Sequence, residues 1–406
     1  MSVAVEVTNN DIQNIVGKLP KSFGGVNRFE VVPLSDSLVG FWGDHFILKV
    51  YNDQLVKHDF FLKAVPRHIE SRLEIIQETG FFEREMKIYE HFIPGLQVLS
   101  SISWSPKIYL AKEDYFIVLE NLRDYHLYPS IINVWDYDHF VVATKTLAVF
   151  HASTVIYEEK FEPMSDDELK LLEEVAYPQK EGHIRYRGVQ TAIATLQKLI
   201  KLIPKYQNSP KLADILKAFP EVVRKIFKFV ESSKKFRNVL LHGDIWVNNV
   251  MFKYENSKPV EAKYIDFQFA RYAPPAMDLV TFFYASSTVK FREKHLKDLL
   301  DIYCKTIENE LKIHNIPTSA LPRDEILKSF NEYKIAGLIE AALFNHTTLL
   351  PSDVATDMMN SSEEYEKFFQ ECRKAKCVKA FEESHYSDRM TEILSELIDD
   401  FIVPYL

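Results

Sequence analysis

Cysteine is scarce in this chain. Three cysteines, Cys304, Cys372 and Cys377, occur among 406 residues, an odd number without the paired spacing of a zinc site. This usage disfavours a disulfide-stabilised scaffold and fits a reducing compartment better. We therefore expect the protein to be cytoplasmic.

Long apolar runs and an excess of positive charge are also missing. No stretch approaches the ~18 consecutive apolar residues that a membrane helix requires, and residues 9–11 are polar where a secretion signal would be apolar. Residues 403–406 match no lipidation or retention signal. The formal net charge of −9 leaves no basic field for a nucleic acid. Neither a membrane nor a nucleic acid is expected as a partner.

The chain has the size and composition of a large globular protein. Its 406 residues exceed one typical domain, and hydrophobic residues make up 47% of them, enough for a sizeable core. We find no internal repeat and no low-complexity tract. Two lobes or two closely joined domains are expected.

Residues 240–278 carry the candidate catalytic side chains. Asp244 follows His242 and Gly243, Asn249 lies five positions further on, and Asp266 ends an expected hairpin of residues 250–265. In metal-dependent phosphoryl transfer, a base aspartate is followed at this interval by a metal-binding asparagine, and a second aspartate on a nearby strand binds the metal again. An ordinary turn with surface polar residues is the alternative. The complete set within one short window favours the phosphoryl-transfer interpretation.

The N-terminal part has the pattern of an antiparallel sheet. Residues 29–34, 44–50 and 60–65 are β-branched and aromatic runs separated by turn residues, which predicts three strands. Lys63 lies among apolar neighbours in the third run, where an unpaired charge is costly. It therefore needs a partner or a ligand.

A helix is expected over residues 69–92. Phe82, Glu85, Met86 and Tyr89 recur at helical spacing, so Glu85 points inward with the apolar side chains. An ion pair between Lys63 and Glu85, with the lysine reaching nucleotide phosphates, is the arrangement of a kinase nucleotide-binding lobe. Glu83 is the rival acid, and solvation of both glutamates is the third possibility.

Two further features bear on nucleotide binding. Residues 115–122 are expected to form an apolar strand that ends in a short polar segment. If this segment joins two lobes, its exposed backbone at Glu120 and Leu122 could hydrogen-bond an adenine edge. A plain edge strand would have the same sequence pattern. Gly40 and Gly43 could let backbone amides approach phosphates, but an ordinary hairpin turn explains them equally well.

The rest of the chain is expected to be mainly helical. The pattern of residues 8–16 predicts a short helix capped by Thr8. A helical period begins at residue 136 and includes His151, which we expect to be a packing residue. Residues 165–236 contain charged helical segments interrupted at Pro178, Pro204 and Pro220, candidates for a substrate-side structure. Helices are also expected over residues 296–311, 333–350 and 363–381.

These motifs resemble, in their order along the chain, those of the ecdysteroid kinase-like family. The residues that carry the resemblance are Phe61-Leu62-Lys63-Ala64-Val65-Pro66, Phe82 to Tyr89 with Glu85, Leu119-Glu120-Asn121-Leu122, Leu147-Ala148-Val149-Phe150-His151-Ala152, His242-Gly243-Asp244-Ile245-Trp246-Val247-Asn248-Asn249 and Asp266-Phe267-Gln268. The family consists of small-molecule kinases related to choline and aminoglycoside kinases. Trp246 before the paired asparagines, and Gln268 after Asp266-Phe267, are the details that separate it from those relatives.

The resemblance implies an α+β, protein-kinase-like fold with two lobes. Residues 1–120 would form a small nucleotide-binding lobe with an antiparallel sheet and a helix, and residues 121–406 a large, mostly helical lobe with the catalytic loop and the substrate-binding helices. The cofactors would be ATP and Mg²⁺, and the partner a small molecule with a hydroxyl group, such as a steroid. A monomer is expected.

The resemblance also implies roles for single residues. Asp244 would accept or orient the substrate hydroxyl proton, Asn249 and Asp266 would bind Mg²⁺, and Lys63 paired with Glu85 would hold the α- and β-phosphates. The backbone at Glu120 and Leu122 would contact the nucleotide base. Asp278 and His242 would brace the catalytic loop.

The sequence leaves three questions of function open. The protein could detoxify foreign hydroxylated compounds, or it could be a catalytically inactive kinase fold that binds a nucleotide or a partner. A cationic, choline-like or aminoglycoside-like substrate would require an acidic or aromatic cage. A hydrophobic steroid would require an apolar slot, to which Tyr125, Tyr128 and Trp135 could contribute unless they belong to the core.

Overall fold

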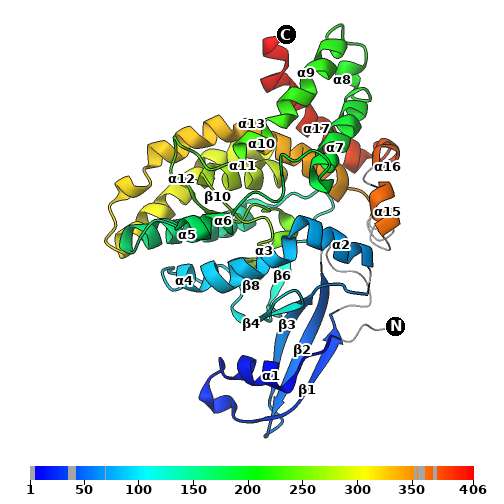
Figure 1. The fold of residues 1–406 in the computed structure, drawn as a ribbon. Helices are drawn as coiled ribbons and strands as arrows, with labels where there is room; N and C mark the ends of the chain where they lie inside the picture. The colour runs from blue at the N-terminus through cyan, green and yellow to red at the C-terminus, as the bar shows by residue number, and fades with distance from the viewer. Residues whose placement is uncertain (1–4, 35–42, 69, 352–353, 355–361, 369–372) are drawn as a thin grey trace.

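The computed structural model describes residues 5–34, 43–68, 70–351, 354, 362–368 and 373–406. A five-stranded antiparallel sheet lies near the N-terminus, and a larger, mainly helical part carries the C-terminus (Figure 1). The sheet order is β1-β2-β3-β5-β4. Its strands are β1 (Val26–Pro33), β2 (Asp44–Asn52), β3 (Lys57–Ala64), β4 (Ile108–Lys112) and β5 (Phe116–Glu120). The three strands expected from residues 29–65, and the strand before Leu122, are confirmed.

The two faces of this sheet have different surroundings. Phe46, Leu48 and Phe60 point to one face, where they pack with Ile12 and Ile15 of helix α1 (Asn9–Val16). Thr8 caps α1, as expected, through a capping box with Asp11. Because side chains alternate along a strand, the residues between them point to the opposite face, toward the helical part of the molecule.

Residues 70–92 are mainly helical, as expected, but the prediction of one continuous helix over residues 69–92 is wrong. It begins with α2 (Glu70–Thr79), breaks at Gly80 with a φ of +67°, and resumes as α3 (Phe81–Lys87). A π-helical turn (Ile88–Phe92) and α4 (Ile93–Gln97) follow. Glycine adopts the left-handed conformation without a Cβ penalty, so it breaks the helix where the hydrophobic period alone shows no boundary.

Two smaller sheets are also present. One has the order β6-β8-β9, formed by Tyr125–Leu127, Val250–Glu255 and Lys258–Tyr264, and the other pairs β7 (Val239–Leu241) with β10 (Arg271–Ala273). The hairpin expected before Asp266 is therefore confirmed. Its turn uses Asn256 and Ser257 at positive φ, so β8 and β9 deliver Asn249 and Asp266 to the same end of the hairpin.

The remaining elements are mainly helices (Figure 1), and the closest packing among them is that of α11 and α17 on α13 and of α12 on α5. Their bounds are α5 Tyr137–Lys160, α6 Asp166–Lys170, α7 Ile184–Ile200, α8 Pro204–Gln207, α9 Leu212–Arg224, α10 Ile226–Phe229, α11 Pro275–Ala285, α12 Val289–Ile313, α13 Arg323–Thr348, α15 Ser362–Lys367, α16 Arg373–Ala380 and α17 Ser384–Phe401. Short 3₁₀ turns occupy Lys21–Phe23, Val247–Asn249, Thr318–Ala320 and Val403–Tyr405.

Two expectations about the helical part need correction or qualification. Pro220 does not interrupt a helix but lies inside α9, whereas Pro204 begins α8 at a position where a missing N–H costs nothing. Within the described residues, α5 is the one helix long and apolar enough to cross a membrane, and 78% of its most apolar window is buried in the protein.

The aromatic and sulfur side chains are also placed. Trp135 belongs to the core rather than to a ligand slot. Cys304 and Cys377 are buried free thiols, and Cys372 lies outside the described residues. The architecture as a whole is the expected α+β, protein-kinase-like fold with two lobes.

Candidate active site

A cavity of about 720 Å³ lies between the five-stranded sheet and the helical part. All seven side chains or backbone positions predicted for the site line it: Lys63, Glu85, Glu120, Leu122, Asp244, Asn249 and Asp266. They come from β3, α3, β5, the segment after it, the catalytic loop and the end of the β8–β9 hairpin. The fold thus brings residues far apart in the sequence to one place.

The predicted ion pair between Lys63 and Glu85 is confirmed. The Lys63 Nζ lies 2.5 Å from Glu85 Oε2 and 2.9 Å from Asp266 Oδ1. The rival acid, Glu83, instead pairs with Lys87 near the surface. Burial opposes the charge on Lys63, but the carboxylates of Asp266 and Glu85 outweigh burial and raise the lysine pKa. The lysine is therefore held charged in the cavity.

The catalytic loop is braced by Asp278 from α11, as expected. The backbone N–H groups of His242 and Gly243 donate to the two Asp278 carboxylate oxygens at 2.8 and 3.0 Å. His151 of α5 contacts the same carboxylate at 3.2 Å through Nε2. His242 accepts the Asp244 N–H at Nδ1 and donates from Nε2 to the Ile265 carbonyl, at 3.2 and 2.9 Å. These bonds link the loop to the segment that leads into Asp266.

Asp244 is almost fully buried at the centre of the site. The Asn249 side-chain amide donates to the Asp244 carbonyl and to its Oδ2, both at 2.9 Å. Oδ1 is buried and has no hydrogen-bond partner inside the described part of the chain, and the side chain of Gln268 interacts with the carboxyl group and lowers its pKa. Burial raises the Asp244 pKa to about 7, with further contributions from the negative charges of Asp266 and Glu340. A buried carboxylate of this kind is suited to accept a proton near neutral pH.

The residues expected to bind a metal have the right chemistry for Mg²⁺. Asn249 commits its NH₂ group to Asp244, which leaves its amide oxygen as the ligand atom. Asp266 adopts a φ of +68°, and its side chain is 28% exposed toward the cavity. Hard oxygen donors suit Mg²⁺, which is usually completed by water and substrate phosphates. Within the described chain, no group of three or more His, Cys, Asp or Glu residues is placed to hold a metal ion.

At the segment between the lobes, the two predicted positions differ. The Glu120 carboxylate accepts a hydrogen bond from the Lys263 ammonium at 2.7 Å, and the backbone N–H of Glu120 donates to the Lys107 carbonyl at 2.8 Å. The Leu122 carbonyl accepts from the Tyr125 amide at 2.9 Å, but no described backbone carbonyl accepts from the Leu122 amide. That amide is therefore the available donor for a base edge. Of the two glycines, Gly40 lies outside the described residues. A Cβ at Gly43 would come within 2.9 Å of the Lys63 Cγ.

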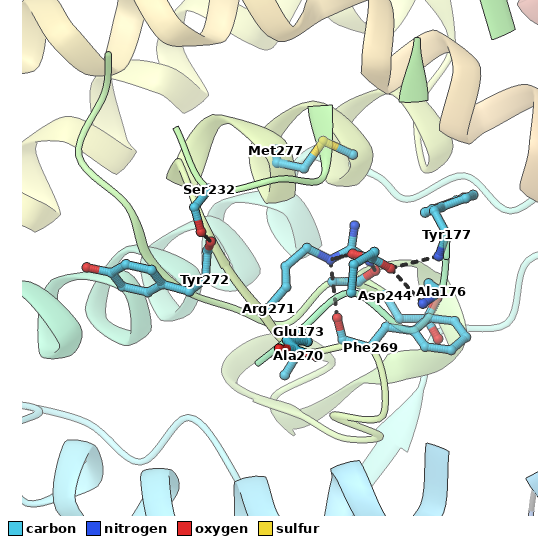
Figure 2. A network of polar contacts seen from close by, with 12 residues as sticks. Glu173, Ala176, Tyr177, Ser232, Asp244, Phe269, Ala270, Arg271, Tyr272 and Met277 are labelled. Atoms are coloured by element: carbon cyan, nitrogen blue, oxygen red, sulfur yellow. Dashed lines mark hydrogen bonds and ion pairs between the residues drawn. The ribbon is translucent and has the colours of Figure 1, made fainter. Parts of the chain in front are cut away.

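A buried network beside Asp244 was not foreseen from the sequence (Figure 2). Arg271 lies 3.2 Å from the Glu174 carboxylate and donates to the carbonyls of Phe269 and Gly243 at 3.3 and 3.4 Å. Glu174 in turn accepts the backbone N–H groups of residues 176 and 177. Arg271 lies between the apolar and aromatic residues of the run 269–273, and this was the signal that a buried acid had to lie nearby. The network fastens the catalytic loop to the segment that precedes α7.

Substituting Gly243 with alanine is expected to impair both stability and activity. Gly243 has a φ of +79°, and a Cβ would lie 2.0 Å from the Phe269 carbonyl oxygen. The left-handed conformation alone costs a residue with a side chain about 1–3 kcal/mol, and the clash would displace the loop. Thermal unfolding and steady-state kinetics measure the two effects. Gly95→Ala is the control because nothing lies within 4 Å of its added Cβ; wild-type behaviour of Gly243→Ala would contradict the close approach.

The sheet with its buried lysine–glutamate pair, the braced loop and the second aspartate together define a small-molecule kinase. The chain belongs to the ecdysteroid kinase-like family, whose family model matches residues 47–316, more than half of the sequence. No match was found among curated proteins.

The similarity to solved structures of other kinases is remote. Ethanolamine kinase from Plasmodium vivax is 13% identical, with a TM-score of 0.40, and the match covers 94% of this chain and 85% of that one. A microcompartment-associated aminopropanol kinase is 12% identical, with a TM-score of 0.41 and coverages of 95% and 100%. The streptomycin–ATP–APH(2'')-IIa ternary complex is 15% identical, with a TM-score of 0.36 and coverages of 89% and 99%. The family assignment depends on the family model and not on these likenesses.

Proposed function

We propose that this protein transfers the γ-phosphoryl group of ATP to a hydroxyl of an apolar small molecule, an ecdysteroid or a similar secondary metabolite. The observation that carries the proposal is the character of the cavity beyond Asp244. There it is lined by apolar side chains of α7, of the catalytic loop and of the end of α13, among them Val189, Ala192, Trp246, Leu343, Phe344 and Leu350. An apolar slot with few polar groups suits a rigid hydrophobic alcohol.

The polar residues divide the chemistry among them. Asp244 would accept the hydroxyl proton and orient the attacking oxygen toward the phosphorus. Lys63, held by Glu85, would hold the α- and β-phosphates, and the Leu122 amide would hold the base. Asn249 and Asp266 would hold Mg²⁺, which neutralises charge on the phosphates. Phosphoryl transfer needs positioning and charge neutralisation more than covalent help, and these residues supply both.

The charges in the cavity disfavour a cationic substrate. Arg185 of α7 lines the acceptor side, and its guanidinium lies 5.2 Å from the Phe269 ring centre. Among the described lining residues, the carboxylates are Glu85, Glu120, Asp244 and Asp266, all on the nucleotide or catalytic side. An amine substrate would thus meet a positive charge where it needs a negative one.

Detoxification of foreign hydroxylated compounds is the second candidate function. A detoxifying kinase would need the same apolar slot and the same catalytic residues, so the geometry of the site is compatible with both functions. A catalytically inactive fold is disfavoured because Lys63, Asp244, Asn249 and Asp266 all converge on the cavity.

A product assay tests this function. Purified protein is incubated with ATP and Mg²⁺ and separately with ecdysteroids, plant phenolic glycosides, choline and an aminoglycoside, and products are detected by mass spectrometry. A single added phosphate on an ecdysteroid is the expected result. Phosphorylation of the phenolic glycosides alone would favour detoxification, and phosphorylation of choline would contradict the apolar-acceptor proposal.

We further propose that residues 1–120 and 121–406 are the two lobes, and that the protein acts as a cytoplasmic monomer. The segment from Glu120 to Leu122 links the five-stranded sheet to β6 of the helical part, which supports a lobe boundary there.

A further inference from the structure

His45, which the proposed catalytic roles leave unused, lies on the sheet face that covers the nucleotide side of the cavity. It is on β2, directly opposite Lys63 of β3, and Ile47 is opposite Phe61 in the same register. Cross-strand partners project from the same face of a sheet. All four side chains line the cavity, so His45 extends the row that contains the phosphate-binding lysine.

The position of His45 in this row places it at the phosphate end. The Lys63 ammonium reaches Asp266, the expected metal ligand, at 2.9 Å, and this contact marks where phosphates would lie. Ile47 and Phe61, the next pair along the strands, are apolar and suited to cover a base. His45 is therefore next to the charged groups and not next to the apolar part of the slot.

One ring nitrogen of His45 lacks a partner. Nδ1 is buried and makes no hydrogen bond within the described part of the chain. Burying a polar atom without a hydrogen-bond partner is unfavourable, so its retention requires a reason. The ring is packed against Phe61, with 5.2 Å between the ring centres, which holds it in place without satisfying Nδ1.

The imidazole is neutral in this setting. The His45 pKa is lowered to about 4, mainly by burial and also by the nearby positive charge of Lys63. The negative charge of Asp266 raises the pKa by a smaller amount. A neutral imidazole can donate one N–H without adding a second positive charge beside the lysine.

We propose that His45 is a nucleotide-contacting residue, whose Nδ1–H donates a hydrogen bond to a phosphate oxygen beside Lys63. This inference rests on the proposed use of ATP but not on the identity of the acceptor. His45 lies just outside residues 47–316, the range matched by the family model, so the family assignment does not assign it a role.

The test compares binding of ADP and of adenosine, each with Mg²⁺, by isothermal titration calorimetry. His45→Leu removes the hydrogen bond, and its Kd for ADP should rise about tenfold to a hundredfold, the usual worth of a hydrogen bond to a charged group. Its Kd for adenosine, which has no phosphate, should stay the same. His45→Gln keeps an N–H donor and should recover most of the ADP affinity.

His58→Leu is the matched control. His58 lies on β3 of the same sheet but does not line this cavity, so its removal should change neither Kd. Equal losses for ADP and adenosine in His45→Leu would overturn the phosphate contact in favour of packing, and unchanged ADP binding would overturn it outright. If His45→Leu does not fold, His45→Gln provides the test. Equal losses of affinity for ADP and for adenosine in His45→Gln would likewise overturn the phosphate contact.

The same measurements separate this inference from the proposed function. Wild-type protein that binds ADP but phosphorylates no alcohol would remove the proposed reaction and leave the His45 contact standing. Wild-type protein that binds no adenine nucleotide would remove both.

Discussion

Replacing Asp244 with asparagine is expected to lower turnover by about 10²–10⁴-fold, the usual contribution of a general base. Asparagine has nearly the same shape, so the loop held by Asn249 and Asp278 should keep its position. It cannot accept the hydroxyl proton, however, and it lacks the negative charge that orients the attacking group. The loss should therefore appear in kcat, with little change in the Kd for ATP.

Stability separates this outcome from simple damage to the fold. Burial penalises the charge of Asp244, so the neutral asparagine variant should unfold at the same temperature as wild type or at a higher one. Glu83→Gln, which neutralises a carboxylate exposed on α3, should leave kcat unchanged. Near-normal turnover in Asp244→Asn would show that Asp244 neither accepts the proton nor orients the hydroxyl.

Replacing Asp266 with alanine is expected to abolish the Mg²⁺ dependence of nucleotide binding. Even the residues that support metal ligands typically contribute 10–100-fold to metal affinity, so loss of a ligand should weaken Mg-ATP binding by at least about 100-fold. Lys63 would keep its pair with Glu85 at 2.5 Å, so the sheet should remain intact. Thermal stabilisation by ATP with Mg²⁺, compared with ATP and a chelator, measures the effect.

A substitution of an acid far from the cavity provides the comparison. Glu113, exposed in the turn between β4 and β5, can be changed to alanine without touching the site, and Mg-ATP should stabilise this variant as it does the wild type. Equal stabilisation of Asp266→Ala by Mg-ATP would show that the metal is bound elsewhere.

The parts of the site that sequence reasoning predicted are those with a local signal. The inward orientation of Glu85 follows from helical spacing, and the need of Lys63 for a partner follows from its apolar neighbours. The hairpin that delivers Asp266 follows from two short apolar runs and a polar turn. Each of these depends on residues close together in the chain.

The parts that were missed depend on contacts between distant segments. The Glu120 carboxylate pairs with Lys263, a partner on β9 that the sequence of its own strand does not indicate. Arg271 meets Glu174 across nearly a hundred residues of sequence, so neither shows its partner locally. His45 joins Lys63 only through the register of β2 on β3. Register is set by the packing of whole strands, so a single run of sequence does not contain it.

The contact between Lys63 and Asp266 has a thermodynamic consequence for ligand entry. The Lys63 ammonium already neutralises the Asp266 carboxylate at 2.9 Å. A metal–nucleotide complex that binds here would therefore replace an existing ion pair and would not meet an unpaired charge. Asp266 would trade the ammonium for a metal, and Lys63 would trade the carboxylate for a phosphate oxygen. The measured affinity would then report the difference between two sets of ion pairs. Because the pair joins β3 to the chain after β9, the cleft is already tied together before that exchange, which lowers the ordering cost of binding.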